Sequence, residues 1–482
     1  MGEIITVSLS QFSGHVTTHL YNAQEALIPY KPNIKLTHDL STFLLRTPPG
    51  SGGVTYTPRA LIYDLRGGFG ALNKYEYHET ITSLTSHVQI NSNPIPKSEY
   101  QIKLDSGEPL TKLTTNNTKY WSDYNRLIYS PKSLHSISSY EYDTKQGHHY
   151  RYPRMSFDTF DKGVEDFKES FEDDEFRHFL EKCDLFTGLQ VFTDLESGWA
   201  GYTSQWLTEI TDEYFNKVDV WTFAQTSTAD NNTKAGVSLN RIKGVVELYK
   251  SSSLLFPMLE HVESPLVQYD QESLWHRSAL HSTFINSLWG LLNQVENRET
   301  MSSIQGALTG RKIVNEIKLI ATDSTNNGGA ETAISDVIDI NAYYSNPPQA
   351  NTHTDTTVFL GIQQNNSDKY FSNNRIVTKD YIEDMQEKPT PNIYINDNIS
   401  NILKQDSFPD DILAFTKFHT EFNIHPGLHE QLKGYRQIVS RTNHPELIKI
   451  IEDRGELVED ISSLMEEYRW GEYDSDDDEF YD

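Results

Sequence analysis

Short apolar runs alternate with longer amphipathic segments along the first part of the chain. Residues Glu3–Leu9 form a β-branched run of strand length, and the polar turn Ser10–Gly14 leads into a segment of helical character. A second apolar run, Ala60–Leu65, is followed by two glycines. The pattern predicts a strand, a turn and a helix, and then a second strand.

The same alternation continues in the middle of the chain. Apolar residues recur at helical spacing over Val164–Cys183, and Gly188 is expected to end this helix. A strand over Leu189–Thr193, a helix over Tyr202–Tyr214 and a strand over Val218–Ala224 follow. Strands that alternate with helices predict an α/β fold with a mostly parallel, doubly wound sheet.

Other segments predict loops and a different ending. The Pro- and Gly-rich residues 48–53 predict an exposed loop, and the polar residues 322–334 predict a loop in a second domain. An apolar stripe over Leu447–Tyr468 predicts a C-terminal helix. Residues 466–482 hold nine acids and one Arg, which predicts a disordered acidic tail.

Composition narrows the class of protein. With 41 Lys and Arg against 69 Asp and Glu, the net charge of -28 argues against binding to nucleic acid or anionic lipid. No apolar run approaches the ~20 residues that span a bilayer, and the first 30 residues contain no Lys or Arg. We therefore expect no transmembrane segment, secretory signal or matrix presequence. The single cysteine, Cys183, suits a reducing compartment, and we expect it to be an inert, packed thiol.

Three turns could offer backbone N–H groups to a phosphate: Ser10–His15, Asp64–Phe69 and Asp194–Gly201. In doubly wound sheets, ligands bind at the carboxyl ends of the strands, where such turns lead into helices. Short turns of Gly and Ser are also common connectors. Each turn taken alone is therefore more typical of a structural link than of a binding site.

Several separated segments, in the same order, resemble the tubulin superfamily. They are the opening MGEIITVSLSQ with Gln11, the segment Thr57–Leu65, the stretch Cys183–Gln190, and Asp212–Tyr214. Other segments resemble more closely the Misato (Dml) family of tubulin-like proteins, which is associated with mitochondrial inheritance. These are Trp121–Tyr124, Pro131–Ser133, the turn Asp194–Gly201, and Trp275–Ala279.

The resemblance implies a domain order and a cellular role. It implies a Rossmann-type, tubulin-like nucleotide-binding domain over residues 1–245, a smaller α/β domain over 246–415, C-terminal helices over 416–468 and the acidic tail over 469–482. It also implies a role in partitioning mitochondria and mitochondrial DNA, from the cytoplasm or the cytosolic face of the organelle. The implied partners are tubulin-like, cytoskeletal or chaperone proteins, with peripheral attachment to mitochondria through proteins and no direct contact with nucleic acid.

The resemblance also implies a site for GTP or GDP. Its residues would be Gln11, Phe12, Ser13, Asp64, Ser197, Gly198, Ala200, Gly201 and Asn240. The sequence departs from tubulins at several of these turns. Ser10 and Ser13 stand where tubulins have glycines, and Phe12 replaces a cysteine that contacts the base. Glu196 would repel phosphate unless it turned outward or a metal intervened, and Arg66, which cannot bind Mg²⁺, replaces a carboxylate near the metal.

Catalysis in tubulin filaments also needs a GxxNxD-type loop from the second domain, and the segment from Asn240 to Pro257 contains no such acid. We therefore name no catalytic residue and no metal ligand, and expect a degenerate GTP site without GTPase activity. Two alternatives stay open. One is an active GTP-hydrolysing, filament-forming tubulin homologue, and the other is an adaptor or chaperone-type interaction protein with a vestigial pocket.

Overall fold

The computed structural model of the chain leaves residues 324–333, most of the segment expected to be a loop, and residues 470–482 of the expected acidic tail outside its described residues. The described residues are 2–29, 36–50, 53–72, 95–143, 148–149, 156–171, 174–214, 217–227, 235–264, 267–268, 270–296, 298–306, 308, 310–323, 334–341, 357–364, 392–396, 405–410, 412, 417–424, 427–451 and 453–469.

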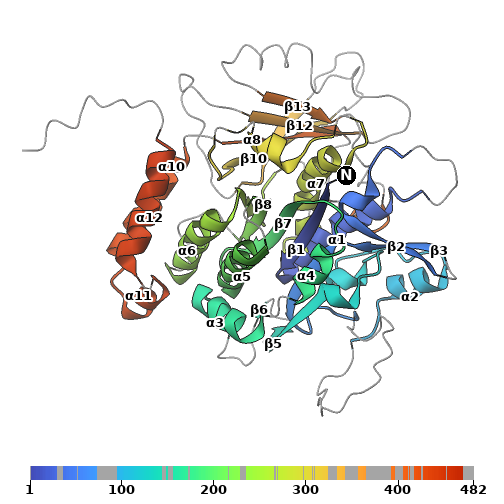
Figure 1. The fold of residues 1–482 in the computed structure, drawn as a ribbon, viewed down its shortest axis with the longest axis horizontal. Coiled ribbons are helices and arrows are strands. Elements are labelled where there is room, and N and C mark those ends of the chain that lie inside the picture. Colours follow the sequence, from blue (N-terminus) through green and yellow to red (C-terminus); the bar gives the residue numbers. More distant parts are fainter. Residues whose placement is uncertain are drawn as a thin grey trace, which may run out of the picture.

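A seven-stranded sheet organises the first half of the chain, in the order β6-β5-β4-β1-β7-β8-β9 (Figure 1). Neighbouring strands from β5 to β9 are parallel, whereas the edge strand β6 is antiparallel to β5. Every residue of β1 is buried, as expected for a parallel sheet covered on both faces. The predicted α/β class is therefore confirmed. The strands are β1 (Glu3–Leu9), β4 (Ala60–Arg66), β5 (Leu134–Asp143), β6 (His148–His149), β7 (Phe186–Asp194), β8 (Asp219–Thr226) and β9 (Leu254–Leu259).

Helices cover both faces of this sheet. The chain leaves β1 for β4 through α1 (Gln11–Glu25), and it leaves β7 for β8 in the opposite direction through α5 (Gly198–Tyr214). Because such crossovers are right-handed, α1 and α5 lie on opposite faces. The buried helix α7 (Leu274–Asn293) packs beside α1, and α3 and α6 pack beside α5. These two helices are α3 (Phe160–Ser170) and α6 (Ala235–Ser251).

A second sheet, in the order β11-β10-β14-β12-β13, lies against α7. Only the pair β12 and β13 is parallel. Residue 245 lies within α6, which is followed by β9 of the first sheet, and β14 (Lys417–Asn423) lies beyond residue 415. Both sheets therefore extend past the expected domain boundaries. The other strands are β10 (Glu316–Asp323), β11 (Ile334–Asp339), β12 (Thr357–Gln364) and β13 (Asn392–Asn396).

Three C-terminal helices pack on α6 (Figure 1). The single helix expected over residues 447–468 is wrong, because two helices divide this segment. The Asp453 carboxylate accepts a hydrogen bond from the Glu456 N–H at 3.1 Å and so caps the second helix. The three helices are α10 (Leu428–Arg441), α11 (Pro445–Ile451) and α12 (Arg454–Glu467).

The helix expected over Val164–Cys183 is also divided, into α3 and α4 (Asp174–Leu180). Gly188, which was expected to end it, lies inside β7. A Cβ at Gly188 would lie 2.3 Å from the Met301 sulfur, so this glycine leaves room for a neighbouring side chain. Its role is in packing and not in ending a helix.

A hairpin contains most of the segment expected to be a loop at residues 48–53. Its strands are β2 (Leu44–Gly50) and β3 (Gly53–Pro58), and the register shifts between Thr47 and Gly50, across the two prolines. Proline lacks an N–H and is tolerated at an irregularity of an edge ribbon. The two prolines therefore interrupt the ladder without preventing the hairpin.

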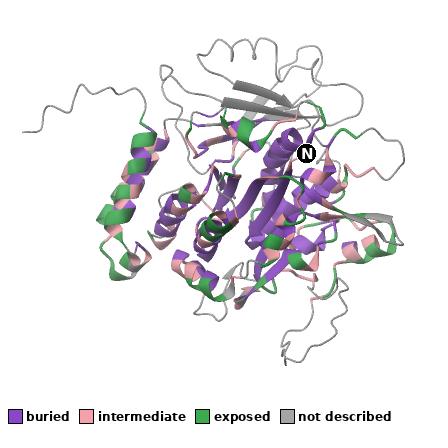
Figure 2. Ribbon diagram, in the orientation of Figure 1, coloured by how far each residue is buried: buried purple, intermediate pink, exposed green. Residues whose placement is uncertain are grey.

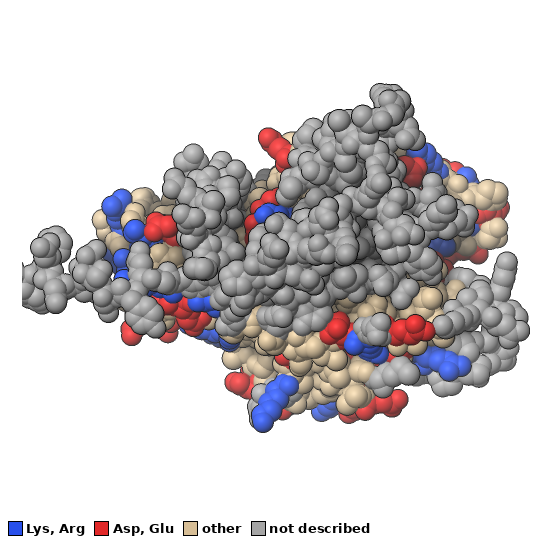
Figure 3. Space-filling view, turned by 90° about the horizontal axis from the view of Figure 1, so that it is seen from above, with Lys and Arg blue, Asp and Glu red and all other residues tan. Residues whose placement is uncertain are grey.

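Burial follows the first sheet and its helices. Figure 2 shows buried residues along its strands and along α7. On the face shown in Figure 3, basic and acidic side chains of the described residues lie interspersed. Among the described residues, no helix combines the length and apolar character needed to cross a membrane. The short helices are η1 (Leu40–Thr42), α2 (Glu99–Ser106), η2 (Trp121–Asp123), η3 (Pro131–Ser133) and α8 (Met301–Gly306).

Candidate functional site

The three turns that could hold phosphate meet at one edge of the first sheet. Strands β4, β1 and β7 are parallel neighbours, so their carboxyl ends lie side by side. The strand order reverses at β1, which is where doubly wound folds bind ligands. The structure brings to this edge Gln11, Phe12, Ser13, Asp64, Ser197, Gly198, Ala200 and Gly201. That they contact a nucleotide stays a prediction.

Ser10 begins α1 in a backbone conformation that is typical of glycine. Its φ of 141° and ψ of 163° lie in a region that other residues rarely adopt. Its hydroxyl accepts a hydrogen bond from the Ser13 N–H at 3.1 Å and donates to the Ser13 hydroxyl at 2.9 Å. The Ser13 hydroxyl donates in turn to Gln225 Oε1 at 3.0 Å. The polar groups of Ser13 are therefore engaged within the protein.

Phe12, expected to lie against a base, is covered by side chains of α7. The His281 imidazole meets the Phe12 ring edge-on, with the ring centroids 5.1 Å apart. The Arg277 guanidinium lies 5.7 Å from the Phe12 centroid and donates a 2.6 Å hydrogen bond to Glu260. Protein side chains thus occupy the surroundings of this ring.

Two buried polar side chains at this edge keep unused hydrogen-bonding capacity. Neither amide atom of Gln11 has a partner among the described residues, although only 1% of the residue is exposed. Asp64 is fully buried, and its Oδ1 accepts a 2.8 Å hydrogen bond from the Leu65 N–H, whereas its Oδ2 has no partner in the described part of the chain. Such atoms mark a place for water or a ligand. Arg66, at the end of the same strand, is exposed.

Burial raises the pKa of Asp64 to about 7. The same carboxyl titrates near ~3.9 in an unfolded chain, so between these two values the folded protein binds the additional proton. The contribution of Asp64 to stability therefore falls as the pH rises through this window. We compare the free energies of unfolding of Asp64→Asn and of the unsubstituted protein, as measured by denaturant titration. The value for the variant is expected to rise relative to the other as the pH goes from acidic to mildly alkaline. A pH-independent difference would contradict the raised pKa.

The carboxylate of Glu196, in the third turn, is bound by other groups of the protein. Its Oε1 contacts the Arg241 guanidinium of α6 and the Thr226 hydroxyl, and its Oε2 accepts a hydrogen bond from the Ser227 N–H at 3.1 Å. The Glu196 and Arg241 side chains are 11% and 4% exposed. The carboxylate is therefore neutralised in a buried ion pair, and the expected repulsion of phosphate is replaced by an internal contact.

The first N–H groups of α5 are engaged within the protein. The Gly198 N–H donates to the Phe157 carbonyl at 3.1 Å, and the Ala200 N–H donates to the Ser197 carbonyl at 3.3 Å. The Trp199 N–H donates to the Ser197 hydroxyl, also at 3.3 Å. A helix N-terminus binds an anion through N–H groups that lack such partners. These three N–H groups are therefore not available to bind a phosphate.

The glycines near this turn allow α3 and α5 to approach closely. A Cβ at Gly201 would lie 1.9 Å from the Phe160 carbonyl oxygen, and a Cβ at Gly163 would lie 1.7 Å from the Gly198 carbonyl oxygen. The obstructing atoms belong to the backbone and cannot rotate away. A glycine-containing turn that resembles a phosphate loop thus serves here in helix packing.

Asn240, on α6, holds the segment that covers the turn. Its Nδ2 donates to the Asp158 carbonyl at 2.8 Å, and its Oδ1 accepts from the Phe160 N–H at 3.2 Å. Both ends of this amide, which was expected at the nucleotide site, are thus engaged with backbone. Sequence reasoning missed this covering segment and also missed Arg241. The one local signal for a buried ion pair was a charged residue, Arg241, directly after Asn240 on an otherwise apolar helix.

The comparisons with known proteins agree with this architecture. A Misato Segment II tubulin-like domain matches residues 2–106, and a tubulin domain matches residues 110–291. The chain is 36% identical to Protein DML1 of Candida albicans, with all of both chains covered. It is 35% identical to Protein DML1 of Scheffersomyces stipitis, with 97% of each chain covered, and 34% identical to that of Debaryomyces hansenii, with 100% of this chain and 99% of the relative covered.

The chain belongs to the Misato/DML1 family of tubulin-like proteins. The resemblance seen in the sequence and the tubulin-like fold class are thereby confirmed, and the similarity extends over the whole chain. Tubulin domains form a family that binds GTP. For this Misato/DML1 chain, nucleotide binding is a matter for proposal.

In this Misato/DML1 chain, the segment from Asn240 to Pro257, where a GxxNxD-type loop was expected to be recognisable, runs from α6 into β9. The first sheet gains this strand before the chain reaches α7. The spacing Gly-x-x-Asn occurs at the end of α7, as Gly290 and Asn293. Two residues further, where the pattern has its acid, stands Val295, which is 51% exposed. This loop also lacks the acid.

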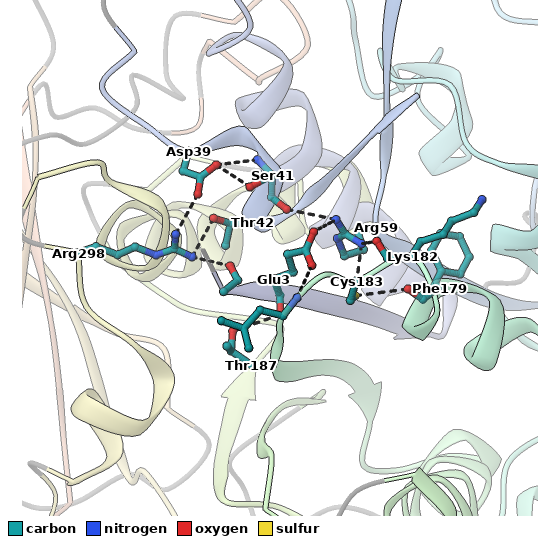
Figure 4. Close-up of polar contacts among 12 residues, drawn as sticks. Glu3, Asp39, Ser41, Thr42, Arg59, Phe179, Lys182, Cys183, Thr187 and Arg298 are labelled. Carbon is teal, nitrogen blue, oxygen red and sulfur yellow. Dashed lines mark hydrogen bonds and ion pairs between the residues drawn. The ribbon is translucent and has the colours of Figure 1, made fainter. Parts of the chain in front are cut away.

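The loop after α7 is fixed to the first part of the same chain (Figure 4). The Asp39 N–H donates to the Asn293 carbonyl at 2.6 Å, and the Val295 N–H donates to the Thr37 carbonyl at 2.9 Å. Arg298 donates to Asp39 Oδ2 at 3.0 Å. These contacts hold the loop against residues 37–39 of its own chain.

A second arginine in Figure 4 contacts the single cysteine. Arg59 donates to Glu3 Oε1 at 2.6 Å and to the Cys183 sulfur at 3.3 Å. Burial raises the pKa of Cys183 to about 11, so the side chain stays a thiol at neutral pH. Cys183 is half-buried and packs against the core, as expected, and that the thiol is inert stays a prediction.

Proposed function

We propose that this Misato/DML1 protein acts in mitochondrial inheritance as a tubulin-like binding protein with a degenerate GTP site. The observation that carries the proposal is the occupied turn after β7. There the N–H groups of residues 198–200 are engaged, and Glu196 is paired with Arg241. GTP hydrolysis depends on held phosphates and on a positioned water, and Val295 stands where the tubulin loop has an acid.

The mitochondrial part of the proposal comes from the resemblance to the Misato family. We place the protein at the cytosolic face of mitochondria and in the cytoplasm, attached through tubulin-like, cytoskeletal or chaperone proteins. The net charge of -28 supports a protein partner over nucleic acid or anionic lipid.

Depleting the protein is expected to produce daughter cells that lack mitochondria or mitochondrial DNA. A chain that carries both Gln11→Ala and Asp64→Asn should restore inheritance, because the proposed activity does not use GTP. Counting cells with labelled mitochondria and mitochondrial DNA measures the rescue. If the double variant is folded and present at normal levels but restores nothing, the site has a function that this proposal denies.

Nucleotide binding, if measured with the purified protein, is expected to be weak and insensitive to Mg²⁺. Arg66 replaces the carboxylate near the metal, and the turn after β7 is closed by internal hydrogen bonds. Calorimetry with GTP, with and without EDTA, tests this, together with assay of guanine nucleotide released from the denatured protein. Tight binding that collapses on chelation would contradict the degenerate site.

One observation favours the alternative of an active, filament-forming GTPase. The unpartnered amide of Gln11 and the unpartnered Asp64 Oδ2 leave buried polar capacity at the switch point. GTP turnover that rises steeply with protein concentration, together with sedimentation of polymers, would support this alternative. An adaptor or chaperone-type protein with a vestigial pocket would show neither GTP turnover nor polymers. Capture of its protein partners would distinguish this second alternative from the GTPase.

A further inference from the structure

Residues 405–410 and 412, from the far part of the chain, pack against α1, α2, α7 and residues 124–126. Residues 405–410 and 412 are described, whereas 397–404 and 413–416 lie outside the described residues. Ser407 is 1% exposed, and Phe408 is 3% exposed. A short segment that buries its side chains in this way has a defined receiving surface. We call that surface the docking face, formed by His19, Tyr100, Tyr124, Arg126 and Trp275.

One end of the segment is held by charge. Arg126 donates to Asp406 Oδ1 at 2.8 Å, and the Tyr100 hydroxyl donates to the same oxygen at 3.3 Å. The Asp406 side chain is 43% exposed. The Arg126 side chain is only 22% exposed, so this pair is partly shielded from water and adds affinity as well as orienting a ligand. It therefore sets the position of the residues that follow.

The next two residues make the buried contacts. The Trp275 indole N–H donates to the Ser407 carbonyl at 3.0 Å. The Phe408 ring meets the His19 imidazole edge-on, with the ring centroids 5.6 Å apart. Further along, the Ile412 carbonyl accepts a hydrogen bond from a backbone N–H of the body at 2.9 Å. One carboxylate, one backbone carbonyl and one aromatic ring are thus recognised in succession.

The docking face is assembled by contacts that do not involve the segment. His19 Nε2 lies 3.0 Å from the Trp275 carbonyl, and His15 Nδ1 lies 2.8 Å from the Tyr124 hydroxyl. Arg126 is also held by Glu25 of α1, at 2.9 Å. Because these contacts already hold the side chains of the face, little conformational entropy is lost when a ligand binds there. Trp, Tyr and Arg are also the residues that most often anchor binding partners.

We propose that the docking face is a peptide-binding site, occupied in cis by residues 405–412. Its ligand in trans is a short peptide that carries a carboxylate two residues before an aromatic ring, as Asp406 precedes Phe408. The local geometry supports this class of ligand, because Arg126, whose Nε pairs with Glu25, directs its Nη1 to the Asp406 carboxylate. The tethered segment has a high effective concentration and so competes with any peptide in trans. The contact is therefore autoinhibitory.

The test uses the full chain with residues 397–416 replaced by a Gly/Ser linker of the same length, which keeps β13 connected to β14. The probe is a fluorescent peptide with the sequence of residues 403–414. Anisotropy is expected to show binding to the linker variant and at least ~10-fold weaker binding to the unsubstituted chain. Adding Arg126→Ala to the linker variant should weaken binding by about tenfold. Lys103→Ala, which alters a half-buried lysine paired with Glu99, is the matched control and should not change peptide binding.

Three results would overturn the proposal. One is a folded linker variant that does not bind the peptide, and another is equal binding by the linker variant and the unsubstituted chain. The third is loss of folding both in the linker variant and in the double variant Asp406→Ala/Phe408→Ala, which would show that the segment belongs to the core. None of these results depends on whether the protein binds GTP, so the two proposals fail or stand separately.

Discussion

Replacing Arg241 with alanine is expected to lower the free energy of unfolding by about 3–5 kcal/mol. The Glu196 and Arg241 side chains are 11% and 4% exposed, so the carboxylate depends on the guanidinium and not on water for its compensation. The variant would keep the 3.1 Å hydrogen bond from the Ser227 N–H but lose the opposite charge. Denaturant titration at neutral pH, followed by circular dichroism, measures the loss.

Arg177→Ala is the matched control for this prediction. Arg177 also pairs with a carboxylate, that of Asp174, but the two side chains are 51% and 72% exposed. Its removal should cost no more than ~1 kcal/mol. Adding Glu196→Gln to Arg241→Ala should recover part of the loss, because the uncompensated charge is gone. If Arg241→Ala cost no more than the control, Glu196 would be free to turn outward, and the turn after β7 would not be closed as described.

Gly201→Ala is expected to cost roughly 3 kcal/mol or more, because the new methyl group overlaps backbone. The added Cβ would lie 1.9 Å from the Phe160 carbonyl oxygen and 3.2 Å from the Val164 nitrogen. Relief requires α3 to move away from α5. That movement would also disturb the Phe157 carbonyl, which accepts the Gly198 N–H. The loss is measured in the same denaturant titrations.

Gly434→Ala provides the control for the glycine prediction. Gly434 lies within α10, and a Cβ there would meet nothing within 4 Å. Alanine favours the helix over glycine by about 1 kcal/mol, so this variant should be as stable as the parent or more stable. If Gly201→Ala left stability unchanged but reduced nucleotide binding, Gly201 would serve phosphate approach and not helix packing.

Together these two pairs of variants test one idea about the turn after β7. The turn after β7, which resembles a tubulin phosphate loop, connects α3, α5 and α6 through internal contacts. The ion pair holds the turn to α6, and the close glycine contacts hold it to α3. A ligand phosphate would have to displace contacts that stabilise the fold. For this reason, the proposed function does not depend on hydrolysis.

Local sequence patterns predicted the first part of the fold well. The strand over Glu3–Leu9 has the predicted bounds, and β4 extends the predicted run Ala60–Leu65 by one residue. These strands are buried on both faces, so their apolar runs are continuous and easily recognised. The parallel order then brought the three turns to one edge, as expected. The prediction was weaker where one long amphipathic pattern contained two helices: Asp453 begins α12 after α11, and α3 and α4 divide the other pattern.

The sequence by itself therefore determined the α/β class, the family resemblance and the edge of the sheet where a ligand would bind. Only the tertiary structure decided what occupies that edge. Arg241 reaches Glu196 from 45 residues away, α7 covers Phe12, and residues 157–160 cover the turn that follows β7. Such contacts join segments that are distant along the chain, and they depend on how helices cross. Hydrophobic periodicity and residue spacing report which face of an element is buried, but not which side chain of another element will lie against it.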